Sequence, residues 1–143
     1  LSLIDVTDPT NPREADKVIL GKRGTDSTAL YTHHGLTGLK VNDSYRIAIP
    51  VRLHAETTQS TGSIRPSTFY QYSNTGLHRF EIDINNQTIG QLPALIVNNQ
   101  ANQASQNISN DRSVIINDDV FYLHNGAFWV QDWQGANSAV GPK

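Results

Sequence analysis

The sequence predicts an all-β protein built from antiparallel meander sheets. Short apolar strands alternate with Asp, Asn, Gly and Pro turn signals along almost all of its 143 residues. The first strand, within Leu1–Pro12, stops at Asp8-Pro9, where an Asx turn and the fixed φ of proline redirect the backbone. Looser copies of this strand-and-turn phrase return at 77–86 and 127–135. Such repetition predicts several sheets of similar build.

The spacing of the phrases favours a propeller-like arrangement. Phe80 and Val130 hold the same place in the second and third phrases, and the interval between them is near the ~40–50 residues of a propeller blade. Three phrases correspond to about two to three blades, fewer than the roughly four to eight that close a propeller. We therefore expect a fragment of a larger β-propeller, which associates with itself, pairs with blades upstream of Leu1, or adopts a more compact sheet packing than the repeats suggest.

Two hairpin regions can be placed by their turns. In 39–51, Asn42-Asp43 forms the turn, and apolar side chains alternate beyond it. In 111–130, three short strands are joined at 117–119 and at Asn125-Gly126. Asn-Gly is the favoured pair for a type I′ turn, since both residues tolerate positive φ. This region is expected to supply one blade's worth of sheet.

Two segments are too polar for core strands. The first, about 55–74, is expected to be a loop inserted on one rim, and the second, about 98–110, an amide-rich loop. Insertions in repeat folds gather on one face, which is often the binding face. The whole chain, 1–143, is expected to form one domain.

The composition of the chain limits the partners and the chemistry that it can have. The net charge of −2 and the pI near 6.2 supply no basic footprint, so we expect no nucleic-acid partner. The longest apolar stretches, such as 47–51 and 94–97, are far shorter than the ~18 residues of a membrane span, so none is expected here. The chain has no cysteine, which excludes disulfides, thiolate metal sites and cysteine nucleophiles. Low Lys and abundant Asn, Gln, Ser and Thr are compatible with export through a bacterial envelope.

Candidate catalytic chemistry is sparse. No Gly-x-Ser-x-Gly elbow is present. His33 and His34 are adjacent, so in the strand expected at 29–36 they face opposite sides, and His33 is expected to hydrogen-bond a turn. The carboxylates near strand ends have no calcium-loop spacing and are expected to form turns and caps. We expect no catalytic residue, no metal site and no cofactor.

Two groups of residues are candidates for binding. The glycine-rich loop at 21–27 offers backbone N–H groups beside Lys22 and Arg23; it forms either an anion nest or, as we favour, a structural loop held by Arg23. It lacks the spacing of a phosphate-binding loop. Exposed aromatic side chains are typical contacts for carbohydrates or proteins. The aromatic candidates are Phe69, Tyr70, Tyr72 and Trp133.

Four segments of the chain occur in the same order as in a known protein family: Leu1–Pro12, 21–33, 47–51 and 112–122. Together they resemble the C-terminal part of a family of secreted bacterial proteins with a β-propeller domain distantly related to WD repeats. The resemblance implies a fold and a secreted or periplasmic location, and carries no biochemical activity. Its most specific part is a Gly-x-Arg-Gly motif that continues to Ala-Leu-Tyr-x-x-His. The motif residues are Gly21, Arg23, Gly24, Ser27, Tyr31 and His33.

The chain departs from this family pattern at two places. Family members usually continue His-Lys-Ala-Phe, where this chain has His-His-Gly-Leu at 33–36, and the insertion at 55–74 is also unusual. Two functional classes therefore stay open. The leading one is a non-catalytic binding or scaffolding propeller segment with a protein or polysaccharide ligand. The alternative is part of a secreted hydrolase or metalloenzyme whose catalytic residues lie mostly in upstream blades.

Overall fold

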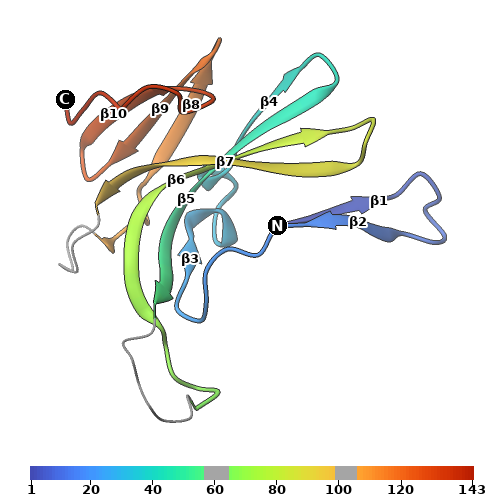
Figure 1. The fold of residues 1–143 in the computed structure, drawn as a ribbon, viewed down its shortest axis with the longest axis horizontal. Helices are drawn as coiled ribbons and strands as arrows, with labels where there is room; N and C mark the ends of the chain where they lie inside the picture. The colour runs from blue at the N-terminus through green and yellow to red at the C-terminus, as the bar shows by residue number, and fades with distance from the viewer. Residues whose placement is uncertain (57–64, 99–105) are drawn as a thin grey trace.

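The structure, a computed structural model, describes residues 1–56, 65–98 and 106–143. Within that part of the chain the regular structure is mainly β-strand, with two short 3₁₀ helices, η1 (Thr28–Leu30) and η2 (His33–Gly35). The strands form three antiparallel sheets, which confirms the predicted fold class (Figure 1). Among the described residues, no helix has the length and apolarity needed to cross a membrane.

The three sheets follow one another along the chain. The first is a hairpin of β1 (Ser2–Asp5) and β2 (Arg13–Lys17). The third is the meander predicted from its turns, with β9 between its two neighbours. The central sheet has the order β3-β5-β6-β7, with β4 also paired to β5. Its strands are β3 (Asp26–Ser27), β4 (Thr37–Val41), β5 (Ser44–Glu56), β6 (Gln71–Asp83) and β7 (Thr88–Asn98), and those of the third sheet are β8 (Arg112–Ile116), β9 (Asp119–His124) and β10 (Ala127–Asp132).

The central sheet buries both of its faces. Successive residues of a strand point to opposite sides, so Ala48 and Ile49 of β5 enter different clusters. One cluster joins the central sheet to β8–β10, and the other joins it to the β1–β2 hairpin and the segment after it. Figure 1 shows the third sheet and the first hairpin at opposite ends of the molecule. The members of the first cluster are Ala48, Leu77, Leu95, Ile115, Val120, Tyr122 and Trp133, and those of the second are Ile49, Val51, Phe80 and Ile89.

The turn predictions are confirmed. Asn42 (φ 52°) turns the chain between β4 and β5, and Asn117 (φ 55°) turns it between β8 and β9. Asn125 and Gly126 both have positive φ, 49° and 81°, as a type I′ turn requires. The Asp8 carboxylate accepts the Thr10 amide at 3.0 Å, which is the Asx turn expected after the first strand.

The polar segments are shorter than predicted. β5 continues to Glu56 and β6 starts at Gln71, so both ends of the range 55–74 belong to a long hairpin; residues 57–64 lie outside the described part. Backbone pairing between two strands does not need apolar side chains, which explains the error. In the range 98–110, β7 includes Asn98 and Ile108 is buried, while 99–105 are not described.

The first hairpin is attached to the central sheet by polar contacts. The amide of Ile89 donates to Asp16 Oδ2 at 2.7 Å, and Gln87 Nε2 donates to Asp5 Oδ2 at 3.1 Å. Hydrogen bonds from Thr7, Arg13 and Gln87 hold the pKa of Asp5 well below its usual value, with those of Thr7 the largest cause. The carboxylates of Asp5 and Asp16 therefore attach the first hairpin to the β6–β7 turn and to the start of β7.

Candidate functional site

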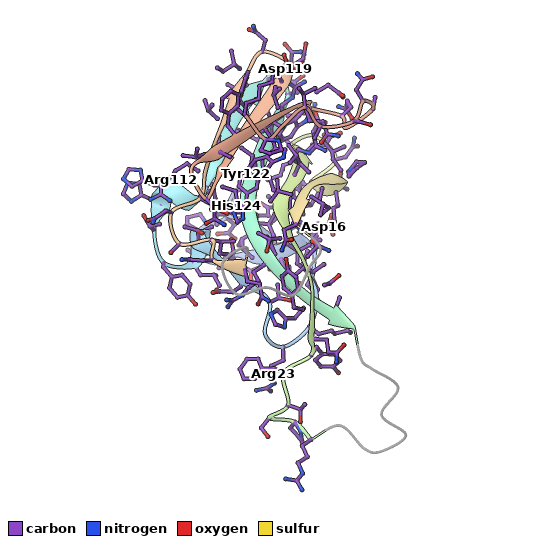
Figure 2. The ribbon with its side chains drawn as sticks, turned by 90° about the vertical axis from the view of Figure 1, so that its left-hand side faces the viewer. Asp16, Arg23, Arg112, Asp119, Tyr122 and His124 are labelled. Carbon is purple, nitrogen blue, oxygen red and sulfur yellow. The ribbon has the colours of Figure 1, made fainter. Side chains whose placement is uncertain are left out.

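The glycine-rich loop at 21–27 and the aromatic segment before β6 lie together in the structure. The amide of Lys22 donates to His54 O at 2.7 Å, and the amide of Tyr70 donates to Arg23 O at 2.9 Å. The Arg23 side chain is exposed, at the end of the molecule where the long β5–β6 hairpin extends (Figure 2). Backbone groups of Lys22 and Arg23, rather than the Arg23 guanidinium that we expected, thus attach this loop to His54 and Tyr70.

Gly24 is needed where the loop meets this segment. Its φ is +108°, a conformation that residues with a side chain rarely adopt. A Cβ atom there would lie 2.9 Å from His54 Nδ1 and 3.0 Å from Phe69 Cδ1. The His54 Nδ1 in turn lies 2.7 Å from Tyr70 O. One motif glycine therefore allows the backbone to pass directly under two rings.

The next part of the motif is fixed from both sides. Ser27 Oγ donates to Pro50 O at 2.6 Å and accepts from the Ala29 amide at 3.3 Å, so it caps η1. The Thr28 hydroxyl donates to Ile108 O. These bonds attach η1 to β5 on one side and to the segment before β8 on the other.

A small pocket with polar residues in its lining opens beside η1, and we call it the Tyr31 pocket. Tyr31 forms its aromatic wall and is 77% exposed. Arg52 Nη2 lies 3.4 Å from Asp26 Oδ2, and a hydrogen bond to Asp26 raises the pKa of Tyr31. Arg52 Nε is buried and has no hydrogen-bond partner within the described residues. The cavity, about 250 Å³, is lined by Asp26, Thr28, Tyr31, Thr32, Arg52, Asn107, Ile108 and Ser109.

The two adjacent histidines do not lie in a strand. His33 and His34 belong to η2, and their rings are 3.9 Å apart rather than on opposite sides. The Thr32 side chain accepts from the His34 amide at 3.4 Å, and this local cap replaces the strand predicted for 29–36. The carbonyl of His33 accepts from Leu36, but its ring is exposed. Among the residues that the structure describes, no group of three His, Cys, Asp or Glu could hold a metal ion.

The four aromatic binding candidates differ in how far their side chains are exposed. Phe69 is 70% exposed, and Tyr70 and Tyr72 are half-buried. Tyr72 lies within β6, and its hydroxyl donates to Asn98 O at 3.1 Å. The prediction for Trp133 was wrong, because it is only 1% exposed. Its ring packs in the cluster between two sheets, with the Arg46 guanidinium 5.4 Å from the ring centroid.

A buried polar cluster in the third sheet was missed from the sequence. The Asp111 carboxylate accepts from the Tyr122 hydroxyl, and His124 Nδ1 lies 2.9 Å from Asp111 Oδ2. All three side chains are buried, and Figure 2 shows Tyr122 and His124 close together in the sheet. Tyr122 and His124 are two apart on β9, and an Asp precedes β8; that spacing is the only signal the sequence contained.

The geometry of this cluster points to a structural role. In a neutral ring whose Nδ1 donates to Asp111, His124 Nε2 is an acceptor, and Asn125 Nδ2 lies 3.0 Å from it. A general base needs that nitrogen within reach of a substrate proton. Here the Asn125 amide occupies it and the ring is only 3% exposed. Burial, with the charge of Asp111, raises the pKa of Tyr122 far above its usual value, so its hydroxyl stays a donor.

We expect Tyr122→Phe to lower the free energy of unfolding by about 1–3 kcal/mol, because the buried Asp111 carboxylate would lose a donor. Urea unfolding measures the effect. Tyr45→Phe is the matched control, since Tyr45 is 40% exposed, and it should change stability by less than about 0.5 kcal/mol. Equal stabilities of the two variants would show that the Tyr122 hydroxyl contributes nothing to stability.

Comparison with known proteins agrees with this architecture. No curated protein and no solved structure matches the chain. A family model described as Beta propeller domain matches residues 1–136, which is almost the whole chain. Its three antiparallel sheets, of two, five and three strands, agree with an all-β family of this kind. This chain therefore belongs to the β-propeller domain family, a fold suited to binding or scaffolding.

Proposed function

We propose that this chain is a non-catalytic binding segment of a bacterial β-propeller, secreted or held in the cell envelope, and that its ligand is a neutral saccharide bound in the Tyr31 pocket. The observation that supports this most directly is the position of Tyr31. An exposed tyrosine ring offers an apolar face with a polar edge, which suits the C–H face and hydroxyls of a sugar.

The polar groups of the pocket fit the same ligand. Asp26 supplies acceptors and Arg52 supplies donors, and the two groups are already paired, so the pocket has no net charge to attract an ion. Asn107 and Ser109 add an amide and a hydroxyl at the wall. A cavity of about 250 Å³ lies below the ~300 Å³ lower limit of drug-sized ligand sites, and is suited to one sugar ring of a longer chain.

The location has compositional support. The chain has no cysteine to be oxidised outside the cell, and it is rich in amides and hydroxyls. Fractionation of cells that produce the protein, with detection by antibody, tests this part of the proposal. Recovery in the cytosol alone would contradict it.

The ligand is tested by titrating the chain, followed by NMR and calorimetry, with neutral glucans, mannans and chitin oligosaccharides. We expect at least one to bind, and Tyr31→Ala to weaken its binding about five- to twelvefold, from the ~1–1.5 kcal/mol of a lost aromatic contact. Tyr31 is exposed, so this variant should fold normally. Tyr45→Ala removes an exposed ring elsewhere and should leave the affinity unchanged.

Two results would overturn the proposal. The first is no binding to any of these saccharides, or binding that Tyr31→Ala leaves unchanged. The second is release of new reducing ends from a bound polysaccharide, which would favour the alternative of a secreted hydrolase. Arg52→Gln separates the contribution of the Arg52 charge from that of the Tyr31 ring, because it keeps the ring and removes the cation beside Asp26.

A further inference from the structure

The outer face of the third sheet is apolar although nothing in the described chain covers it. Residues paired directly across an antiparallel sheet share a face, and here Val114 pairs with Phe121, and Leu123 pairs with Phe128. A sheet with one face in solvent normally alternates apolar and polar residues, whereas this one buries its inner face and is apolar on its outer face too. We define the outer face as Val114, Ile116, Phe121, Leu123 and Phe128; all except half-buried Phe121 are between 42% and 50% exposed.

The outer face has opposite charges at its two ends. Arg112, which lies in register with Leu123, stands at one end, and Asp119, which lies in register with Ile116, stands at the other. Figure 2 shows Asp119 and Arg112 well separated along the sheet. Asp119 is exposed and makes no side-chain hydrogen bond within the described residues. Arg112 Nη1 donates to the carbonyl of Asp111, and the other N–H groups of the guanidinium stay available for a partner.

This arrangement makes the outer face complementary to itself. A two-fold axis that lies parallel to the sheet and runs across its strands reverses the strand direction. It places the Arg112 end of one sheet over the Asp119 end of the other. Stacked sheets lie about 10 Å apart, a gap that apolar side chains fill and that the long side chain of Arg112 can span at the rim.

We propose that this chain forms a two-fold symmetric dimer in which the outer faces of two copies pack together, with Arg112 of each copy paired to Asp119 of the other. The contact is isologous, which means that both copies contribute the same surface. The Arg112–Asp119 ion pair therefore forms twice in each dimer. Apolar burial supplies the attraction, and the charges fix the orientation.

A second open apolar surface among the described residues is a less suitable partner for the outer face. It is a groove of about 600 Å³ beside the first hairpin, at the opposite end of the molecule from β8–β10 (Figure 1). Its carboxylate, Asp5, is already paired to Arg13 at 2.8 Å. A head-to-tail contact between groove and outer face would therefore leave Arg112 and Asp119 unpaired, whereas self-packing pairs both.

Sedimentation velocity of the 143-residue chain over a range of concentrations tests the proposal. We expect a concentration-dependent dimer that Arg112→Glu and Asp119→Arg each weaken at least tenfold. The double variant carries both reversed charges and re-forms the pair with opposite signs, so it should dimerise within about threefold of the original chain. Asp43→Arg, a charge reversal in an exposed turn elsewhere, should have no effect.

The outcomes against the proposal are distinct. A monomer at every concentration overturns it, as does a dimer that the double variant fails to restore. A dimer that Ile4→Lys abolishes and Val114→Lys does not would place the contact in the groove and overturn it as well. Arg112 is half-buried and the other substituted positions are exposed, and circular dichroism of each variant verifies its fold.

Discussion

Replacing Arg79 by methionine is expected to lower the free energy of unfolding by about 3–5 kcal/mol. Arg79 lies in β6 and is completely buried. Its guanidinium donates to Pro93 O at 3.0 Å, to Asp132 O at 2.7 Å and to Trp133 O at 2.9 Å, and also to Gln131 Oε1. Methionine fills much of the same volume but leaves these buried acceptors without a donor.

The size of the effect follows from where these carbonyls lie. Pro93 belongs to β7, whereas Asp132 is the last residue of β10 and Trp133 follows it, so one side chain joins two sheets. Burial lowers the pKa of Arg79 from its usual value, and the Asp132 charge opposes that change. Gly135 completes the site, since a Cβ there would lie 2.7 Å from Arg79 Nη2.

Urea unfolding of three variants tests this role. Arg79→Lys keeps the charge but has no planar fork to reach acceptors on two sheets, so it should recover only part of the loss. Arg23→Met, at an exposed arginine, should stay within about 0.5 kcal/mol of the original chain. An Arg79→Met variant as stable as Arg23→Met would show that the Arg79 side chain does not hold the two sheets together.

Acid is expected to destabilise the protein through His78. This ring is buried, and neither of its nitrogens has a hydrogen-bond partner within the described chain. Burial lowers the pKa of His78 from 6.5 to about 4. Below pH 6.5 the unfolded chain takes up a proton that the folded chain refuses, so stability falls as the pH drops from 6.5 to about 4 and is fully present above that window. The loss amounts to about 3 kcal/mol.

A difference measurement isolates this contribution from the carboxylates. His78→Phe cannot titrate, so between pH 7 and pH 4 it should lose about 3 kcal/mol less than the original chain. The phenyl ring suits the site, since His78 lies on the same face of β6 as Phe80 and opposite Ile49. His34→Phe, at an exposed ring, should keep the original pH dependence. Parallel pH profiles for the original chain and His78→Phe would refute the assignment.

Local signals in the sequence predicted the strands and turns well. Asn42, Asn117 and the Asn125-Gly126 pair lie in turns because few other residues tolerate positive φ, and this preference needs no tertiary context. Strand ends were harder to predict. The long β5–β6 hairpin runs into polar sequence because backbone pairing continued beyond the apolar core.

The candidate site was predicted only in part. The motif residues from Gly21 to His33 were identified, but their division into a buried anchor at Ser27 and an exposed ring at Tyr31 depends on η1, which Ser27 caps. Arg52 and Asn107 are distant in sequence and join the Tyr31 pocket only through the fold. Trp133 could not be placed because it is buried in a cluster that residues of two sheets, such as Leu77 and Val120, form together.

The sequence by itself determined the all-β class, the antiparallel hairpins and the absence of cysteine chemistry, because these depend on residue type and on neighbours in the chain. Only the tertiary structure decided which polar residues are buried. Arg79, His78 and Asp111 have ordinary sequence neighbours, and their roles come from carbonyls, apolar side chains and a tyrosine supplied by other strands. Burial and long-range pairing are properties of the packed sheets, so no local pattern could have shown them.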